Sequence, residues 1–138
     1  MTSEKDVFDE FEEIALEEAK KTYSERVIQL FLNPQNFGEM ENPDCYTFMS
    51  GICGDTIGIY IGHVNGTIDR VSFVTNGCGP TIACASALTC MAKGRPIHDA
   101  MKITSDELIV YLGGLPRENT HCADLAVNTL RGALEKLV

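Results

Sequence analysis

The sequence lacks any apolar run close to the ~20 residues that a membrane-spanning helix needs. Its first residues, Met1–Asp6, are polar and acidic, and they resemble neither a secretory signal nor a transit peptide. Positive charge is also scarce, because 11 lysines and arginines face 20 aspartates and glutamates, for a net charge of −9. These absences predict a cytoplasmic protein that binds neither membranes nor nucleic acids.

The sequence also lacks a Cys-x-x-Cys pair, although it contains six cysteines. Neither a zinc-ribbon knuckle nor a thioredoxin-type redox pair is therefore available. Without an export signal, a framework of three disulfides is not expected either. Any metal site must take its ligands from distant parts of the chain, so the fold decides which cysteines can act together.

A single domain spanning residues 1–138 fits the length of the chain and its apolar content of 44%. Helical spacing of the apolar residues over residues 6–31 predicts two helices, with a break near Thr22 where Ser24 can cap the second helix. Eight of the 20 acidic residues fall within residues 1–21, which we therefore expect to form an extra acidic helix with a solvated face.

Three β-strands are predicted where β-branched residues alternate with polar ones, at residues 45–52, 55–64 and 67–75. Asn65 and Gly66 separate the last two strands and have the sequence of a type I′ hairpin turn. Ile68, Val71 and Phe73 do not share one parity along the third strand, so a bulge is compatible with the pattern.

Most of the remaining chain is predicted to be helical, over residues 79–93, 96–101, 105–111 and 120–137. Pro80 lies in the first turn of one helix, and Thr120 is expected to cap the last. Residues 33–44 and 115–119 are expected to be loops. The predicted fold class is α+β, with a small three-stranded antiparallel sheet packed against about five helices.

The predicted hairpin places three candidate ligands at one end of the sheet. The strand after Asp55 runs away from Cys53, and its partner must return antiparallel, which brings Cys78 beside them. Glycines flank these residues, as expected where the backbone turns tightly or approaches a ligand closely. Asp55 has two open interpretations, a ligand or a turn residue that caps the backbone.

Two of the cysteines are predicted to lie at helix starts. Cys78 precedes the helix that Pro80 opens, and Cys122 lies in the first turn of the last helix. The positive end of a helix lowers the pKa of a thiol below its free value of about 8.5, so both thiols are expected to be reactive. His121 adjoins Cys122 but points ~100° away from it on a helix, so the pair is expected to be two ligands rather than a catalytic dyad.

The other cysteines and histidines are expected to have no role at the site. Cys84 and Cys90 lie on an apolar helix and are predicted to be core residues, while no partner can be argued for Cys45. His63 and His98 are expected to be surface residues.

Five short motifs, taken in their order along the chain, resemble those of a known protein family. They are Tyr-Ser-Glu-Arg-Val at 23–27, Asn-Pro-Gln-Asn-Phe-Gly at 33–38, Cys-Gly-Asp at 53–55, Gly-Cys-Gly at 77–79 followed by Ala-x-Ala-Ser at 83–86, and His-Cys at 121–122. In this order and spacing they resemble the IscU-type iron–sulfur cluster assembly scaffolds, equivalent to the N-terminal domain of NifU. The resemblance covers about residues 22–136.

The resemblance implies a site and a set of partners. Cys53, Cys78 and Cys122, with Asp55 or His121, would assemble a labile 2Fe–2S cluster, or a 4Fe–4S cluster on a dimer. Zinc would be able to fill the cluster-free site. Sulfur would arrive on Cys122 as a persulfide from a cysteine desulfurase, iron from an iron donor, and the cluster would pass to apo iron–sulfur proteins. Such a protein is a scaffold without classical turnover, and a second copy of the chain, in a homodimer or higher oligomer, is among its expected partners.

Departures from the family pattern define the alternatives. Residues 115–120 read Leu-Pro-Arg-Glu-Asn-Thr where members served by a DnaK-type chaperone carry Leu-Pro-Pro-Val-Lys before His-Cys, which argues against that partner. The alternative function is a zinc-dependent sulfur-transfer protein of the SufU kind, and a third is a structural zinc domain. SufU-type relatives usually carry an insertion between the last two site cysteines and lack the histidine, so the compact interval from Cys78 to Cys122 and the presence of His121 favour the scaffold.

Overall fold

The computed structural model describes residues 16–138, so most of the predicted acidic N-terminal helix lies outside the described residues. Residues 16–22 are helical, and this stretch ends at the predicted break near Thr22. Across residues 16–138, no helix combines the length and the apolar character that a membrane crossing requires.

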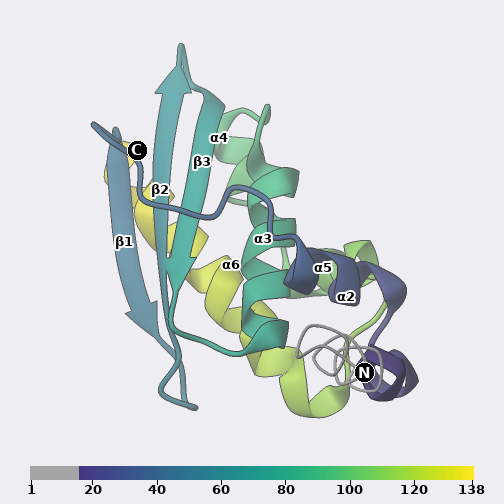
Figure 1. Ribbon diagram of the computed structural model, residues 1–138. Coiled ribbons are helices and arrows are strands. Elements are labelled where there is room, and N and C mark those ends of the chain that lie inside the picture. Colours follow the sequence, from purple (N-terminus) through teal and green to yellow (C-terminus); the bar gives the residue numbers. More distant parts are fainter. Residues whose placement is uncertain (1–15) are drawn as a thin grey trace, which may run out of the picture.

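The protein has a layer of three antiparallel strands and a layer of helices (Figure 1). The strands are β1 (Cys45–Ser50), β2 (Thr56–Val64) and β3 (Thr67–Thr75), and they lie in the order β1-β2-β3. The α-helices that follow residues 16–22 are α2 (Glu25–Leu32), α3 (Gly79–Ala92), α4 (Ile97–Ala100), α5 (Ser105–Tyr111) and α6 (Thr120–Leu134). Two short 3₁₀ helices, η1 (Arg117–Asn119) and η2 (Glu135–Leu137), flank α6. The predicted α+β class, with a three-stranded antiparallel sheet against helices, is confirmed.

The core lies between the sheet and two helices. Helix α6 packs against β1 and β2, and α3 packs against β3 and α6. Alternate residues of β2 face this layer, and Ile57, Ile59 and Ile61 are fully buried there. This alternation is the expected pattern of a sheet with one buried face. Helix α3 is buried nearly all round, as its shortage of polar residues predicts.

The predicted irregularity in the hairpin is confirmed. Ile61 pairs with Val71 and Gly62 with Arg70, but His63 pairs with Ile68, so β3 carries one extra residue at this point. This bulge lets both Ile68 and Val71 face the core although their numbers differ in parity. The turn itself has positive φ at Asn65 (52°) and Gly66 (81°), as a type I′ turn requires.

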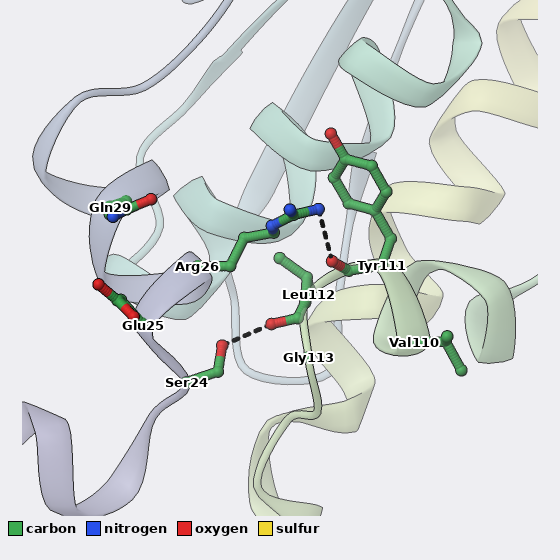
Figure 2. Close-up of a pocket in the computed structure, with 8 residues that line it drawn as sticks. All are labelled: Ser24, Glu25, Arg26, Gln29, Val110, Tyr111, Leu112 and Gly113. Carbon is green, nitrogen blue, oxygen red and sulfur yellow. Dashed lines mark hydrogen bonds between the residues drawn. The ribbon is translucent and has the colours of Figure 1, made fainter.

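Ser24 caps α2 as the sequence predicts. Its hydroxyl oxygen accepts a hydrogen bond from the Val27 N–H at 3.1 Å. The same hydroxyl donates a hydrogen bond to the carbonyl of Leu112, beyond α5 (Figure 2). Arg26 adds a second link, because its Nη1 donates to the carbonyl of Tyr111 at 3.2 Å. These bonds join α2 to the end of α5 beside an open pocket, and the described residues that line it include no cysteine or histidine.

Five chain segments meet at one end of the sheet, the lower end in Figure 1. These are the end of β1, the start of β2, the end of β3 and the first turns of α3 and α6. The pairing of Ser50 with Thr56 and of Ile57 with Thr75 fixes the three strand ends against one another. Segments far apart in the sequence are thereby brought to a common place.

Candidate functional site

Cys53 lies at the tip of a tight loop between β1 and β2. The loop closes through two backbone hydrogen bonds, from Gly51 N–H to the Asp55 carbonyl at 2.8 Å and from Gly54 N–H to the Gly51 carbonyl at 3.0 Å. Gly54 has φ of +83°, a conformation that favours glycine. The turn leaves the Cys53 thiol exposed at the end of the sheet.

Cys78 is the residue immediately before α3, and its thiol is also exposed. Thr56 N–H donates to the side chain of Asn76 at 2.9 Å, which ties the segment after β3 to the start of β2. Pro80 occupies the first turn of α3, as predicted. The hairpin prediction that placed Cys78 beside the Cys53–Asp55 loop is therefore confirmed.

His121 connects the first turn of α6 to the Cys53 loop. Its Nε2 atom lies 3.1 Å from Cys53 Sγ and 3.6 Å from Cys122 Sγ. The prediction that His121 points away from Cys122 is wrong, because the imidazole is long enough to reach the sulfur of the next residue. His121 is half-buried, whereas Cys122 is only 1% exposed.

Thr81 contacts three of the predicted site residues, although sequence reasoning missed it. Its hydroxyl donates to Asp55 Oδ2 at 2.8 Å and lies 3.4 Å from Cys122 Sγ and 3.7 Å from Cys78 Sγ. Thr81 is completely buried. Its spacing was a usable signal, because a polar residue three positions after Cys78 on an apolar helix lies on the same side of that helix.

The five predicted site residues therefore lie together, joined by these contacts. Within residues 16–138, no three histidine, cysteine, aspartate or glutamate side chains form a ready-made group around one metal ion. The contacts run instead through shared neighbours, with His121 between two cysteines and Thr81 between Asp55 and two cysteines. The five side chains are thus linked through shared neighbours at one end of the sheet.

The pKa of Cys122 differs from the sequence prediction. Burial raises the pKa of this thiol, the neighbouring Cys78, Asp55 and Cys53 add to the rise, and the hydrogen bond from Thr81 opposes it. The expected lowering by the helix start is therefore wrong for Cys122. The physical reason is that removing a thiolate from water costs more than the partial charge of the helix end returns.

The start of α6 also differs from its prediction. Asn119 rather than Thr120 is the residue before the helix, and the Thr120 hydroxyl donates to the carbonyl of Arg117 at 3.0 Å. The predicted loop at 115–119 contains the 3₁₀ turn η1. Asn119 Oδ1 accepts a hydrogen bond from the Tyr23 hydroxyl at 3.3 Å, which attaches this turn to the segment before α2.

The remaining cysteines and histidines lie mainly where they were expected. Cys84 is fully buried and burial raises its pKa, which confirms it as a core residue, while Cys90 is only partly buried. Cys45 is buried, and this raises the pKa of its thiol to about 11. His98 is exposed, as expected, whereas His63 is half-buried.

Comparison with known proteins identifies relatives of this chain by sequence. The profile of the NifU-like N terminal domain matches residues 22–137. The iron–sulfur cluster assembly scaffold protein IscU 1 of Archaeoglobus fulgidus is 42% identical over 113 residues, which cover 81% of this chain and 74% of that protein. IscU of Aquifex aeolicus is 39% identical over 82% of this chain and 74% of its own length. The nitrogen fixation protein NifU of Azotobacter chroococcum is 37% identical, and the match spans 37% of that protein.

Solved structures share the fold. A SUF-system iron–sulfur cluster assembly scaffold candidate from Fervidobacterium islandicum superposes with a TM-score of 0.66 at 20% identity, over 81% of this chain and 96% of that one. The N-terminal part of a NifU-like protein from Brucella abortus gives a TM-score of 0.62 at 14% identity, over 83% and 92%. The resemblance seen in the motifs is thus confirmed over nearly the whole described chain. This chain belongs to the family of NifU-like N-terminal domains.

Proposed function

We propose that this protein is a scaffold on which an iron–sulfur cluster is assembled and from which the cluster passes to other proteins. One observation carries the proposal: thiols from three distant segments, a carboxylate and an imidazole meet at one end of the sheet. Relatives that match most of the chain are named iron–sulfur cluster assembly scaffolds, which supports the same function. The cluster is the cargo of such a protein and not its resident cofactor.

The proposed ligands are Cys53, Cys78 and Cys122, with Asp55 or His121 as the fourth. Thiolates are the ligands that iron–sulfur clusters prefer, and a binuclear 2Fe–2S cluster takes two protein ligands on each iron. A carboxylate or imidazole binds such iron more weakly than a thiolate, which favours release of the cluster. The exposed thiols of Cys53 and Cys78 are accessible to an incoming acceptor. A 4Fe–4S cluster shared by two copies is the alternative cargo.

Cys122 is the proposed acceptor of sulfur. In this step the Cys122 thiolate attacks the outer sulfur of a donor persulfide, a new S–S bond forms, and the donor leaves as its thiolate. Because Cys122 is 1% exposed and its pKa is raised, the surrounding side chains must move apart and a base must take the thiol proton. The Nε2 atom of His121, 3.6 Å from the sulfur, is placed to accept that proton in its neutral form.

The partners follow from this chemistry. A cysteine desulfurase supplies persulfide sulfur, an iron donor supplies iron, and apo iron–sulfur proteins receive the cluster. The protein itself needs no catalytic turnover for this role. The alternative is zinc-dependent sulfur transfer of the SufU kind, in which three cysteines and an aspartate hold one zinc ion. Because the fold is similar to that of a SUF-system protein, the same experiment is designed to test this alternative as well.

Anaerobic reconstitution separates the two functions. The protein is incubated with ferrous iron, a cysteine desulfurase, cysteine and a thiol reductant, which supplies the electrons that convert persulfide sulfur to sulfide. It is then examined by visible absorption and Mössbauer spectroscopy. A scaffold gains the spectrum of a 2Fe–2S cluster, and the serine variant of Cys53, Cys78 or Cys122 loses it. Cys90→Ser is the matched control and retains the cluster. Tight zinc binding with faster sulfide release and no cluster would instead establish the sulfur-transfer function.

Mass spectrometry of the same mixture without iron tests sulfur entry. We expect a mass increase of one sulfur atom on the peptide that contains Cys122. Persulfide mainly on Cys45 or Cys90 would contradict the proposed acceptor. Persulfide on the exposed Cys53 or Cys78 would show that exposure, and not the position on α6, selects the acceptor.

A further inference from the structure

We propose that Thr81 is a positioning residue, whose hydroxyl holds the Asp55 carboxylate in the orientation that makes the bound cluster labile. The inference rests on the scaffold function proposed above. Thr81 belongs to none of the five motifs that carry the family resemblance.

The Thr81 hydroxyl has three acceptors within reach and one proton to donate. Asp55 Oδ2 is closest at 2.8 Å, while Cys122 Sγ and Cys78 Sγ lie at 3.4 Å and 3.7 Å. A hydroxyl makes its strongest hydrogen bond to a charged acceptor, and sulfur is a weak acceptor. In the cluster-free protein, while Cys122 keeps its own proton, the hydroxyl of Thr81 therefore donates to Asp55.

The Thr81 side chain is fixed, whereas Asp55 lies at the end of a loop. Thr81 is fully buried in the first turn of α3, and its β-branched side chain has little rotational freedom. A methyl group on Gly77 would lie 2.7 Å from Thr81 Cγ2, so Thr81 is packed closely on that side. The Asp55 loop, in contrast, carries the exposed Cys53 at its tip. The hydrogen bond thus ties the loop with Cys53 to the helix that follows Cys78.

Loss of this bond has a predictable consequence for cluster release. An untethered Asp55 is free to turn toward solvent, and the imidazole of His121, which lies 3.1 Å from Cys53 Sγ, then competes for the fourth position. A cluster held by the stronger donor leaves more slowly. Thr81→Val keeps the branched shape of the side chain and replaces the hydroxyl with a methyl group, which cannot donate a hydrogen bond. We expect transfer to an apo-ferredoxin to slow at least about twofold, the smaller end of the coupling between residues in contact.

A double-mutant cycle with Asp55 tests the inference. Transfer from the reconstituted protein is followed by circular dichroism for wild type, Thr81→Val, Asp55→Ala and the double variant, with Thr81→Ser as the conservative replacement. Positioning through Asp55 predicts that Thr81→Val slows transfer only while Asp55 is present, and that Thr81→Ser transfers like wild type. Equal slowing in both backgrounds, or no slowing in either, overturns the inference. Thr129→Val, which removes another fully buried helical hydroxyl, is the control for general loss of stability.

Urea unfolding of the cluster-free variants gives an independent readout. If the hydroxyl binds the carboxylate, Thr81→Val lowers the unfolding midpoint more when Asp55 is present than in the Asp55→Ala background. Additive midpoints would overturn the contact itself. If wild type gains no cluster on reconstitution, the proposed function fails, but the unfolding cycle still decides whether Thr81 and Asp55 are coupled.

Discussion

Replacement of Gly77 by alanine tests how closely the site is packed. A Cβ atom at Gly77 would lie 2.7 Å from Thr81 Cγ2, 2.8 Å from Thr81 Cβ and 3.1 Å from Asp55 Oδ2. Real Cβ atoms essentially never approach below 3.0 Å, so either the loop or the start of α3 must shift. Thr81 cannot yield easily, because it is fully buried on a regular helix. The strain therefore falls on the contact between Thr81 and Asp55.

The change in the free energy of unfolding expected for Gly77→Ala is the sum of two opposing effects. Insertion of a methyl group into a packed site costs typically about 1–3 kcal/mol of stability. Alanine also restricts the unfolded chain more than glycine does, which returns roughly 0.4–1 kcal/mol. We expect a net loss of about 1–2 kcal/mol in the free energy of unfolding, and a melting temperature lower by about 3–4 °C per kcal/mol for a domain of this length. Thermal and urea unfolding of the cluster-free protein measure both quantities.

Two further variants make the Gly77→Ala result decisive. Adding Thr81→Ser removes the Cγ2 atom that the new methyl group meets and keeps the hydroxyl, so part of the lost stability should return. Gly132→Ala lies on α6 away from the site, where the nearest atom would be Thr47 Cγ2 at 3.3 Å, and alanine favours the helix by about 0.5–1 kcal/mol. Gly132→Ala should therefore leave stability nearly unchanged. If Gly77→Ala is as stable as wild type, the close packing of Thr81 against this loop is refuted.

Three other outcomes are expected. Asp55→Ala should retain its cluster longer and transfer it to an apo-ferredoxin more slowly, and equal transfer rates would leave Asp55 as a turn residue. Ser24→Ala should lower the free energy of unfolding by about 1–2 kcal/mol in urea, because it removes the cap of α2 and the bond to Leu112, while Ser24→Thr should cost less. Burial raises the pKa of Cys45 to about 11, so the unfolded chain loses this thiol proton first as the pH rises. Stability should then fall by up to about 1.4 kcal/mol per pH unit between about pH 9 and 11, and a Cys45→Ala variant with the same slope under anaerobic conditions would contradict this.

Local signals in the sequence were sufficient to predict the main secondary-structure elements of the fold. Alternation of apolar residues along β2, the Asn65-Gly66 turn and the Ser24 cap each depend on a few neighbouring residues. The hairpin connectivity extended this to part of the site, because antiparallel pairing of β2 with β3 brings Cys53 and Cys78 to the same end of the sheet whatever the rest of the chain does. The presence of Cys122 at the same site was implied by the resemblance and not by any local pattern.

Only the tertiary structure decided the environment of Cys122 and the contacts of Thr81. Packing of α6 against β1 and β2, and of α3 against α6, sets how deeply the first turn of each helix is buried. A helix start is read from a few residues and predicts a lowered thiol pKa, but desolvation depends on every atom that covers the sulfur. Cys122 is covered almost completely, so burial outweighs the helix end and raises the pKa of its thiol. The contact between Thr81 and Asp55 likewise joins residues 26 positions apart, and its existence depends on how the loop and the helix pack in three dimensions.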